Sequence, residues 1–175
     1  PTIQRYRAPA NVTAALEELA QFWNAYLDHL QVETPDAAMN AMLNVHNPRQ
    51  CYITLNWSRY LSLYQVGLGS RGIGYRDSCQ DGMGVVSQVP ADARVVIERA
   101  LSVQKADGSA MHQYYPATME ASIGDAAEGE DRPKYYGDDH LWAILATAAY
   151  LKETGDLAFL DKQISYYDAP ASSDS

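Results

Sequence analysis

Helical periodicity, with no convincing strand alternation, is the feature of this sequence that most limits its fold. Apolar side chains recur at steps of four and three along residues 12–30, and they place on one helix face Val12, Leu16, Leu19, Trp23, Tyr26 and Leu30. Start signals and apolar spacing predict further helices over residues 34–45, 50–65, 90–102, 138–153 and 157–162, with one or two turns over 81–88. This succession predicts an all-α fold.

The helix ends are predicted from residues that start or stop helices. Asn11 and Thr34 are the expected N-caps of the first two helices, and Pro48 is expected to end the second one. Residues 51–55 have strand propensity, but the helical spacing that follows them favours helix. Gly155 fits the position that follows a helix ending near residue 153.

The connections between these helices are very unequal in length. Residues 67–74 are dense in glycine, and residues 109–137 are irregular and polar. Because the loops of a four-helix bundle are mostly short, this pattern favours helical pairs with long, aromatic-rich loops on one rim, as in an α/α toroid. The low-complexity segment 169–175 is predicted to be a loose tail.

Composition excludes several classes of protein. The net charge of −9 argues against binding to nucleic acid, and no apolar run approaches the roughly 20 residues that span a membrane. Two distant cysteines support neither a zinc site nor a disulfide framework. The excess of 13 Tyr and 3 Trp over 2 Phe suits either an irregular core or surfaces that bind sugars, which have apolar faces and polar edges.

Charged side chains are concentrated in residues 71–81, where two arginines and two aspartates accompany glycines. A carboxylate and a guanidinium together can fix vicinal sugar hydroxyls, the first as acceptor and the second as a rigid donor. An Arg–Asp ion pair that clamps a loop to a helix is the structural alternative. Arg59, on the preceding helix, is either paired structurally or aimed into a pocket for an anion such as phosphate.

Several motifs resemble those of glycoside hydrolase family 94, a family of inverting phosphorylases. They occur in family order over about residues 20 to 168 and comprise Gln50 to Arg59, Gly69 to Asp81, Gln104 to Gln113, Tyr136 to Trp142 and Ala149 to Asp156. The phrase Gly-Ser-Arg-Gly-Ile-Gly-Tyr-Arg-Asp-Ser, at residues 69–78, is most similar to cellodextrin phosphorylases. The resemblance implies that residues 1–168 are the first half of an (α/α)6 barrel.

The resemblance also implies roles for individual residues. Arg71 and Asp77 match residues that hold the glucosyl ring in the −1 subsite, and Arg59 matches an arginine near the phosphate. Further substrate-binding candidates lie in matching motifs, namely Tyr75, Arg76, His112, Gln113, Asp138, Asp139 and Trp142. For the Asp138–Asp139 pair, simple stabilisation of a helix N-terminus is the alternative.

The implied reaction is inverting phosphorolysis of β-1,4-glucan oligosaccharides such as cellodextrins or cellobiose. Inorganic phosphate would be the co-substrate, the products α-glucose 1-phosphate and a shortened sugar, and no metal or organic cofactor is implied. The general-acid aspartate of the family belongs to a motif further downstream, so no catalytic residue is expected in this chain, and we expect the chain alone to be inactive. We further expect a homodimeric, cytoplasmic enzyme, and the acidic net charge predicts that it binds neither nucleic acid nor membrane.

Two positions depart from the family pattern, and three other functions remain open. His46 and Arg49 stand where the family usually has tryptophan and tyrosine, which we interpret as a change on the substrate side. Two of these alternatives are a non-catalytic sugar-binding module and a purely structural helical domain. An inverting glycoside hydrolase on the same toroid would need two convergent carboxylates, such as Asp77 with Asp81 or Asp138.

Overall fold

The computed structural model describes residues 2–60, 62, 72–124 and 135–169. Contacts between residues divide the chain into two compact units, residues 1–49 and 50–175. Most described residues are helical, which confirms the predicted all-α class. The assignment of residues 1–168 to one partial barrel stays a prediction, and residues 170–175 of the predicted tail lie outside the described residues.

The first unit contains α1 (Thr2–Arg5), α2 (Pro9–Leu27), α3 (Ala37–Ala41) and the π-helix η1 (Met42–His46). Proline at the first position starts α2, so the predicted N-cap Asn11 lies inside the helix, where its amide donates to the Arg5 carbonyl at 2.7 Å. The cap of α3 is Asp36 and not Thr34, because the Asp36 carboxylate accepts two backbone N–H groups of that helix.

The helix that follows α3 does not stop at Pro48 as predicted. Pro48 lies in the first turn of α4 (Asn47–Leu55), which continues from η1 and into a second π-helix, η2 (Asn56–Tyr60). The Asn47 N–H donates to the carbonyl of Met42, five residues back. This wide turn accommodates a proline, whose ring and missing N–H would otherwise break the helix. Helix, and not strand, is therefore confirmed over residues 50–60.

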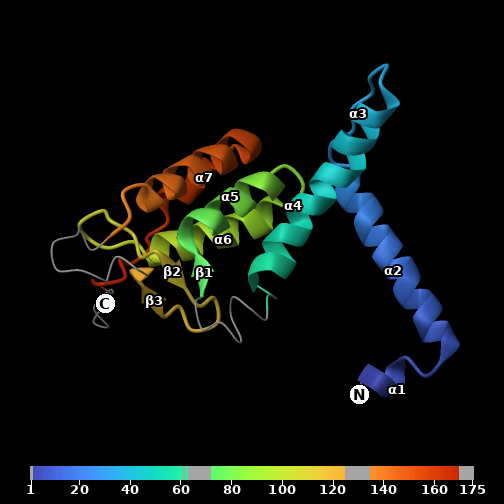
Figure 1. The fold of residues 1–175 in the computed structure, drawn as a ribbon, viewed down its shortest axis with the longest axis horizontal. Coiled ribbons are helices and arrows are strands. Elements are labelled where there is room, and N and C mark those ends of the chain that lie inside the picture. The colour runs from blue at the N-terminus through green and yellow to red at the C-terminus, as the bar shows by residue number, and fades with distance from the viewer. Residues whose placement is uncertain (1, 61, 63–71, 125–134, 170–175) are drawn as a thin grey trace. The chain divides into compact units, whose positions relative to one another are not determined.

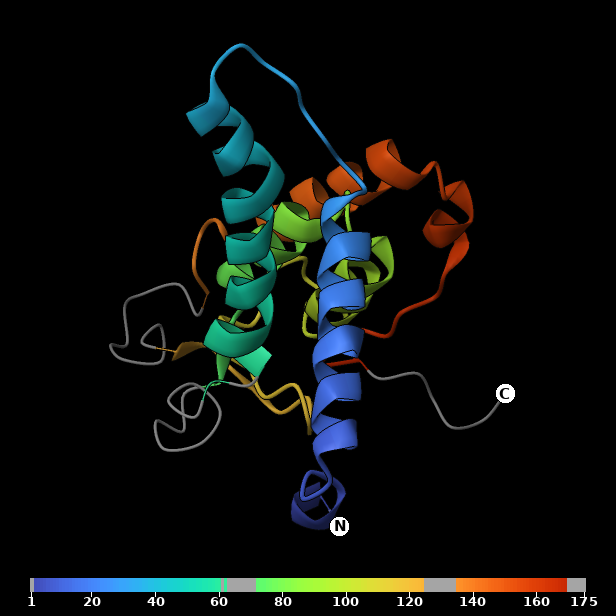
Figure 2. The same ribbon diagram turned by 90° about the vertical axis from the view of Figure 1, so that its right-hand side faces the viewer.

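Three helices form the body of the second unit and pack against one another. They are α5 (Tyr75–Val85), α6 (Pro90–Ser102) and α7 (Asp139–Thr154), and all three pairs are in contact. Figure 1 shows them side by side, with the small sheet near one end, and Figure 2 gives the view at right angles. Gly155 ends α7 with φ +67°, as predicted, and the 3₁₀-helix η5 (Leu157–Asp161) follows.

The start of α5 is the main departure from the predicted helices. Residues 75–80 were expected in a loop, yet the helix begins at Tyr75. Its buried face consists largely of small or polar residues, namely Tyr75, Ser78, Cys79, Gly82 and Val85. A methyl group on Gly82 would lie 3.4 Å from a Val96 methyl carbon, so small residues let α5 and α6 pack closely. Hydrophobic periodicity misses such a helix because serine and glycine do not register as apolar.

A three-stranded antiparallel sheet joins two distant parts of the sequence. Its order is β1 (Ile73–Gly74), β2 (Gln113–Tyr114) and β3 (Ala121–Ser122). The pairing continues beyond β1, where the Tyr75 N–H donates to the His112 carbonyl at 2.8 Å. The N-terminus of α5 is therefore fixed beside the segment that carries His112, and no sequence pattern predicted this sheet.

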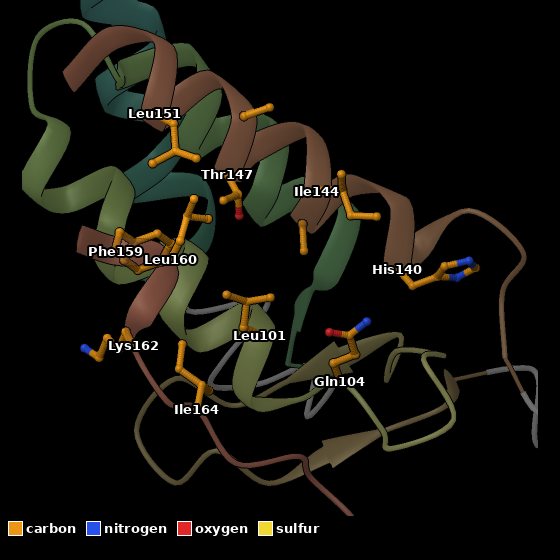
Figure 3. A pocket seen from close by; sticks show the side chains of 12 residues that line it. Leu101, Gln104, His140, Ile144, Thr147, Leu151, Phe159, Leu160, Lys162 and Ile164 are labelled. Carbon is orange, nitrogen blue, oxygen red and sulfur yellow. The ribbon is translucent and has the colours of Figure 1, made fainter. Parts of the chain in front are cut away.

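An apolar groove of about 420 Å³ lies between α7, the end of α6 and η5. Figure 3 shows Ile144, Thr147 and Leu151 of α7 and Leu101 near the end of α6 among its lining. None of the predicted site residues lines this groove. Three leucine and isoleucine side chains of α7 are also largely exposed, at positions 141, 144 and 145. The lining is mostly apolar, although Gln104, His140 and Lys162 also contribute to it. Within the described residues, no helix has the length and apolarity to span a lipid bilayer.

Substitution of Gly72 tests the junction between β1 and β2. Gly72 has φ +73°, and a Cβ there would lie 2.8 Å from the Tyr114 carbonyl oxygen. We expect Gly72→Ala to lower the free energy of unfolding by about 3 kcal/mol in urea titrations. Gly108→Ala is the matched control, because Gly108 has φ +89° but no atom within 4 Å of the added Cβ, and it should cost only about 1 kcal/mol. Equal losses would contradict the close approach.

Candidate functional site

Of the predicted sugar-binding pair Arg71 and Asp77, the structure describes Asp77, and Arg71 lies outside the described residues. Asp77 is described and lies in the first turn of α5, so it is helical and not in a loop. The N-terminus of a helix favours the negative charge of its carboxylate. Gly74 lies against this carboxylate, since a Cβ on Gly74 would meet the Asp77 Oδ2 at 2.7 Å. The Asp77 side chain is 47% exposed and is therefore open to a ligand.

The described cation next to Asp77 is Arg59, at the end of η2. Its Nη2 lies 3.9 Å from Asp77 Oδ2, and its Nε lies 2.9 Å from Asp81 Oδ2. Asp77 and Asp81 are four residues apart on α5, so they lie on the same face of the helix. The Arg59 side chain is 18% exposed and Asp81 is 11% exposed. One guanidinium therefore lies between an open carboxylate and an enclosed one.

The two carboxylates around Arg59 differ in their electrostatics as well as in exposure. The pKa of Asp81 is raised to about 6, because burial and the nearby Asp77 carboxylate together outweigh the opposing effect of Arg59. Asp81 therefore approaches protonation within a pH range in which exposed aspartates remain charged. Sequence analysis named Asp81 only as a possible second carboxylate of a hydrolase. Asp81 lies four residues after Asp77. A predicted helix over residues 75–80 would therefore have placed both carboxylates on one helix face.

A second cluster joins the N-termini of α5 and α7. Arg76 Nη1 donates to Asp138 Oδ2 at 2.9 Å, and Trp142 Nε1 donates to the same oxygen at 3.3 Å. The hydrogen bond from Arg76 lowers the pKa of Asp138, so this carboxylate is charged. Asp138 occupies the N-cap position, but its side chain makes no capping hydrogen bond. Its contacts therefore do not support simple side-chain capping, although its charge still lies at the helix N-terminus.

A third cluster places a histidine against a buried carboxylate. His112 Nδ1 lies 2.8 Å from Asp139 Oδ2, and Asp139 is fully buried. The imidazole stacks on the Tyr136 ring with 3.9 Å between the ring centroids. A Cβ on Gly124 would meet the His112 ring at 2.7 Å, so the ring is confined on that side too. Burial raises the pKa of Asp139, and His112 opposes that rise.

The remaining predicted residues that the structure describes are Tyr75, at the start of α5, and Gln113, in β2. Tyr75 is fully buried, and burial raises the pKa of its hydroxyl strongly, so it remains neutral. A ligand would reach Tyr75 or Asp139 only if the surrounding side chains moved. Gln113 lies in β2 and donates to the Ser122 hydroxyl at 2.9 Å across the sheet. Tyr136, which the sequence analysis named only as the start of a matching motif, contacts His112 directly.

The two departures from the family pattern lie in the first unit or at its boundary. His46 and Arg49 are both exposed. The Arg49 guanidinium lies 5.4 Å from the centroid of the Trp23 ring, which is within the range of a cation–π contact. At this position the arginine therefore packs on an aromatic ring of the same unit. A substrate-side role for either residue stays a prediction.

The described clusters offer hydrogen-bonding chemistry for polar, uncharged ligands and for anions. Arginine and histidine N–H groups donate, while the open carboxylates accept from hydroxyl groups. Among the residues that the structure describes, no three or more His, Cys, Asp or Glu side chains are grouped as they would be around a metal ion.

Comparison with known proteins places this chain in a family of carbohydrate-active enzymes. The catalytic-domain model of the Glycosyl hydrolase 94 superfamily matches residues 22–173. An N,N'-diacetylchitobiose phosphorylase of Vibrio furnissii is 31% identical over 179 residues, which cover 94% of this chain and 22% of that protein. A solabiose phosphorylase of Paenibacillus borealis is 28% identical over 164 residues, which cover 94% of this chain and 18% of that protein.

A third relative is named for a different activity. The cyclic beta-(1,2)-glucan synthase NdvB of Rhizobium meliloti (strain 1021) is 31% identical over 158 residues, which cover 90% of this chain and 5% of that protein. The chain thus spans about a fifth of the length of the phosphorylase relatives and far less of the synthase.

Removal of His112 tests how Asp139 is held. We expect His112→Ala to lower the free energy of unfolding by about 3 kcal/mol at pH 7.5, because a buried carboxylate loses its partner. The pKa of Asp139 is raised by folding, so stability in this variant is complete below the ordinary aspartate pKa and falls as the pH rises through the raised value. Chemical denaturation from pH 4 to 8 measures this slope.

The double variant His112→Ala with Asp139→Asn provides the control. A buried amide avoids the cost of a buried charge, so the double variant should regain part of the lost stability at pH 7.5 and lose the pH slope. Arg76→Ala, which breaks an exposed ion pair, should have little effect. A double variant that is less stable than His112→Ala would show that charge burial is not the cause.

Proposed function

This chain belongs to the Glycosyl hydrolase 94 superfamily, and from that membership we propose that the polypeptide containing it cleaves oligosaccharides with inorganic phosphate. Two of the relatives carry phosphorylase names, which supports phosphorolysis as the reaction. The observation on which the proposal rests is the exposed Asp77 carboxylate with the Arg59 guanidinium beside it. Together they present an acceptor and donors on one surface.

In this proposal the chain binds the sugar whose bond is cleaved. The Asp77 carboxylate accepts hydrogen bonds from ring hydroxyls, and the Arg59 guanidinium donates to a hydroxyl or to the phosphate. Phosphate attacks the anomeric carbon from the face opposite the leaving sugar. It is already anionic, so a cation can position it and no second carboxylate is needed to activate water. The acid that protonates the leaving oxygen is expected in polypeptide beyond residue 175.

The identity of the sugar substrate is a more specific part of the proposal. The motif at residues 69–78 favours cellodextrin or cellobiose, with α-glucose 1-phosphate as product. The relatives' names instead specify N,N'-diacetylchitobiose and solabiose. A panel of cellobiose, cellotetraose and N,N'-diacetylchitobiose separates these possibilities. We also propose that the enzyme is homodimeric and cytoplasmic and that it uses no metal or organic cofactor.

One observation favours a second candidate, an inverting hydrolase. Asp81, with its pKa near 6, and the exposed Asp77 lie around one guanidinium, and glycosidases use two carboxylates whose pKa values differ. The Asp81 side chain is largely enclosed, however, and contacts Arg59. A general acid must reach the leaving oxygen, so the enclosure of Asp81 favours the phosphorylase.

Dependence on phosphate is the direct test of the reaction. The test uses the native polypeptide, by which we mean the polypeptide containing this chain at the length made in the cell. We expect it to release a sugar 1-phosphate from at least one sugar of the panel in phosphate buffer, and to leave that sugar intact in a phosphate-free buffer. Free reducing sugar formed without phosphate would support the hydrolase instead. Sugar binding without cleavage in either buffer would support the binding module.

Substitution of Asp77 tests its contact with the sugar. We expect Asp77→Ala in the native polypeptide to lower kcat/KM by about 10- to 100-fold, which corresponds to the loss of about 1.5–3 kcal/mol of charge-assisted hydrogen bonding. Asp92→Ala is the matched control, since Asp92 is an exposed carboxylate in the first turn of α6. Equal kcat/KM for both variants would contradict a role for Asp77 in binding.

A further inference from the structure

The position of Arg59 depends on a contact that lies away from the open side of the site. The Nε atom of Arg59 contacts Asp81, and an Nη atom points towards Asp77 at the longer distance of 3.9 Å. The contact is an ion pair without hydrogen-bond geometry, because Nε and Asp81 Oδ2 are both buried and have no hydrogen-bond partner in the part of the chain that the structure describes. Attraction between the two charges therefore holds the Nε side of the guanidinium against Asp81. Nη1 donates to the Ser58 carbonyl at 3.5 Å, so Nη2 is the group that remains as a donor on the side of Asp77.

The exposure of the two carboxylates separates their roles. Asp77 is 47% exposed, which leaves room for a ligand, whereas Asp81 at 11% is largely enclosed. A sugar or phosphate that contacts Asp77 therefore has little access to Asp81. Asp81 can act on such a ligand only through the arginine that it holds.

The surroundings of Asp81 disfavour its charge. Among the described residues, the ionisable groups coupled to Asp81 are Arg59 on η2, Asp77 on α5 and the Cys51 thiol on α4, and of these Arg59 is the cation. Burial and Asp77 both oppose ionisation of Asp81. Enclosed ion pairs of this kind contribute little net stability, because desolvation offsets the attraction. A charge that lies in surroundings that disfavour it, and that contacts a cation beside an open carboxylate, points to a role in the site.

We propose that Asp81 is a positioning residue, which touches no substrate but fixes the Arg59 guanidinium beside Asp77 so that donors and acceptor meet the ligand in one geometry. The inference rests on the proposed function of Asp77 and Arg59 as the sugar- and phosphate-binding pair. It assigns to the second aspartate of the Tyr75–Asp81 segment a function distinct from that of the first.

The test compares Asp81→Asn with the wild type in the native polypeptide. The asparagine keeps the shape of the side chain but removes the charge that attracts Arg59. We expect about a tenfold weaker Kd by calorimetry for the neutral monosaccharide that the phosphorolysis assay identifies, glucose or N-acetylglucosamine. A neutral sugar is used because its own ionisation does not change with pH. Asp92→Asn, at an exposed carboxylate, should leave the Kd unchanged.

Two further readouts separate positioning from a structural role. The melting temperature of Asp81→Asn at pH 8 should equal or exceed that of the wild type, because the cost of an enclosed charge is removed. The wild type should bind the sugar more weakly as the pH falls through about 6 and Asp81 is protonated, whereas Asp81→Asn should show no such change.

The possible outcomes are distinguishable. Unchanged affinity in Asp81→Asn, with normal binding by the wild type, would overturn the positioning role and leave the proposed function intact. A variant that unfolds or melts lower at pH 8 would also overturn it, in favour of a structural role. A wild type that neither binds nor cleaves any sugar of the panel would instead refute the proposed function, and the inference with it.

Discussion

The pairing of β1 with β2 is the constraint on which the arrangement of the candidate site depends. It is a very short ladder, but it fixes the N-terminus of α5 beside the segment that carries His112. The close approach of Gly72 to the Tyr114 backbone and the burial of Tyr75 hold this junction in the core. Side chains from α5, the sheet and the start of α7 are thereby brought together, although Arg76 and Asp138 lie 62 residues apart in the sequence.

Burial distinguishes the carboxylates that gather at this end of the second unit. Asp77 and Asp138 are about half exposed, whereas Asp81 and Asp139 are enclosed and each has a raised pKa. The enclosed members hold a cationic or imidazole side chain, Arg59 in one case and His112 in the other. In a binding site, an open carboxylate can contact the ligand while an enclosed carboxylate orients a neighbouring side chain.

The sequence predicted the helices that depend on apolar spacing or on clear end signals, and it missed features that depend on small residues and on distant pairing. The helix over residues 90–102 begins at Pro90 as expected. The helix α5 was missed at its start because Ser78 and Gly82 carry much of its buried face. Asn11 failed as a cap because Pro9 starts the helix earlier, and Pro48 failed as a stop because a π-turn precedes it.

For the site, the sequence supplied the residues but not their partners. The motifs of the resemblance brought Arg59, Asp77, His112 and Asp139 into consideration, and the family match confirmed that resemblance. Which carboxylate meets which cation depends on the sheet and on helix packing, so spacing could not reveal it. The predicted partner of Asp77, Arg71, lies outside the described residues, and Arg59 is the cation that the structure places nearby.

A crystal structure of the native polypeptide with glucose or N-acetylglucosamine bound tests the central claim most directly. The account predicts a sugar hydroxyl within about 3 Å of an Asp77 carboxylate oxygen, with Arg59 in contact with Asp81 and directed towards the same ligand. A sugar bound elsewhere, with Asp77 and Arg59 paired only to each other beneath the surface, would contradict it.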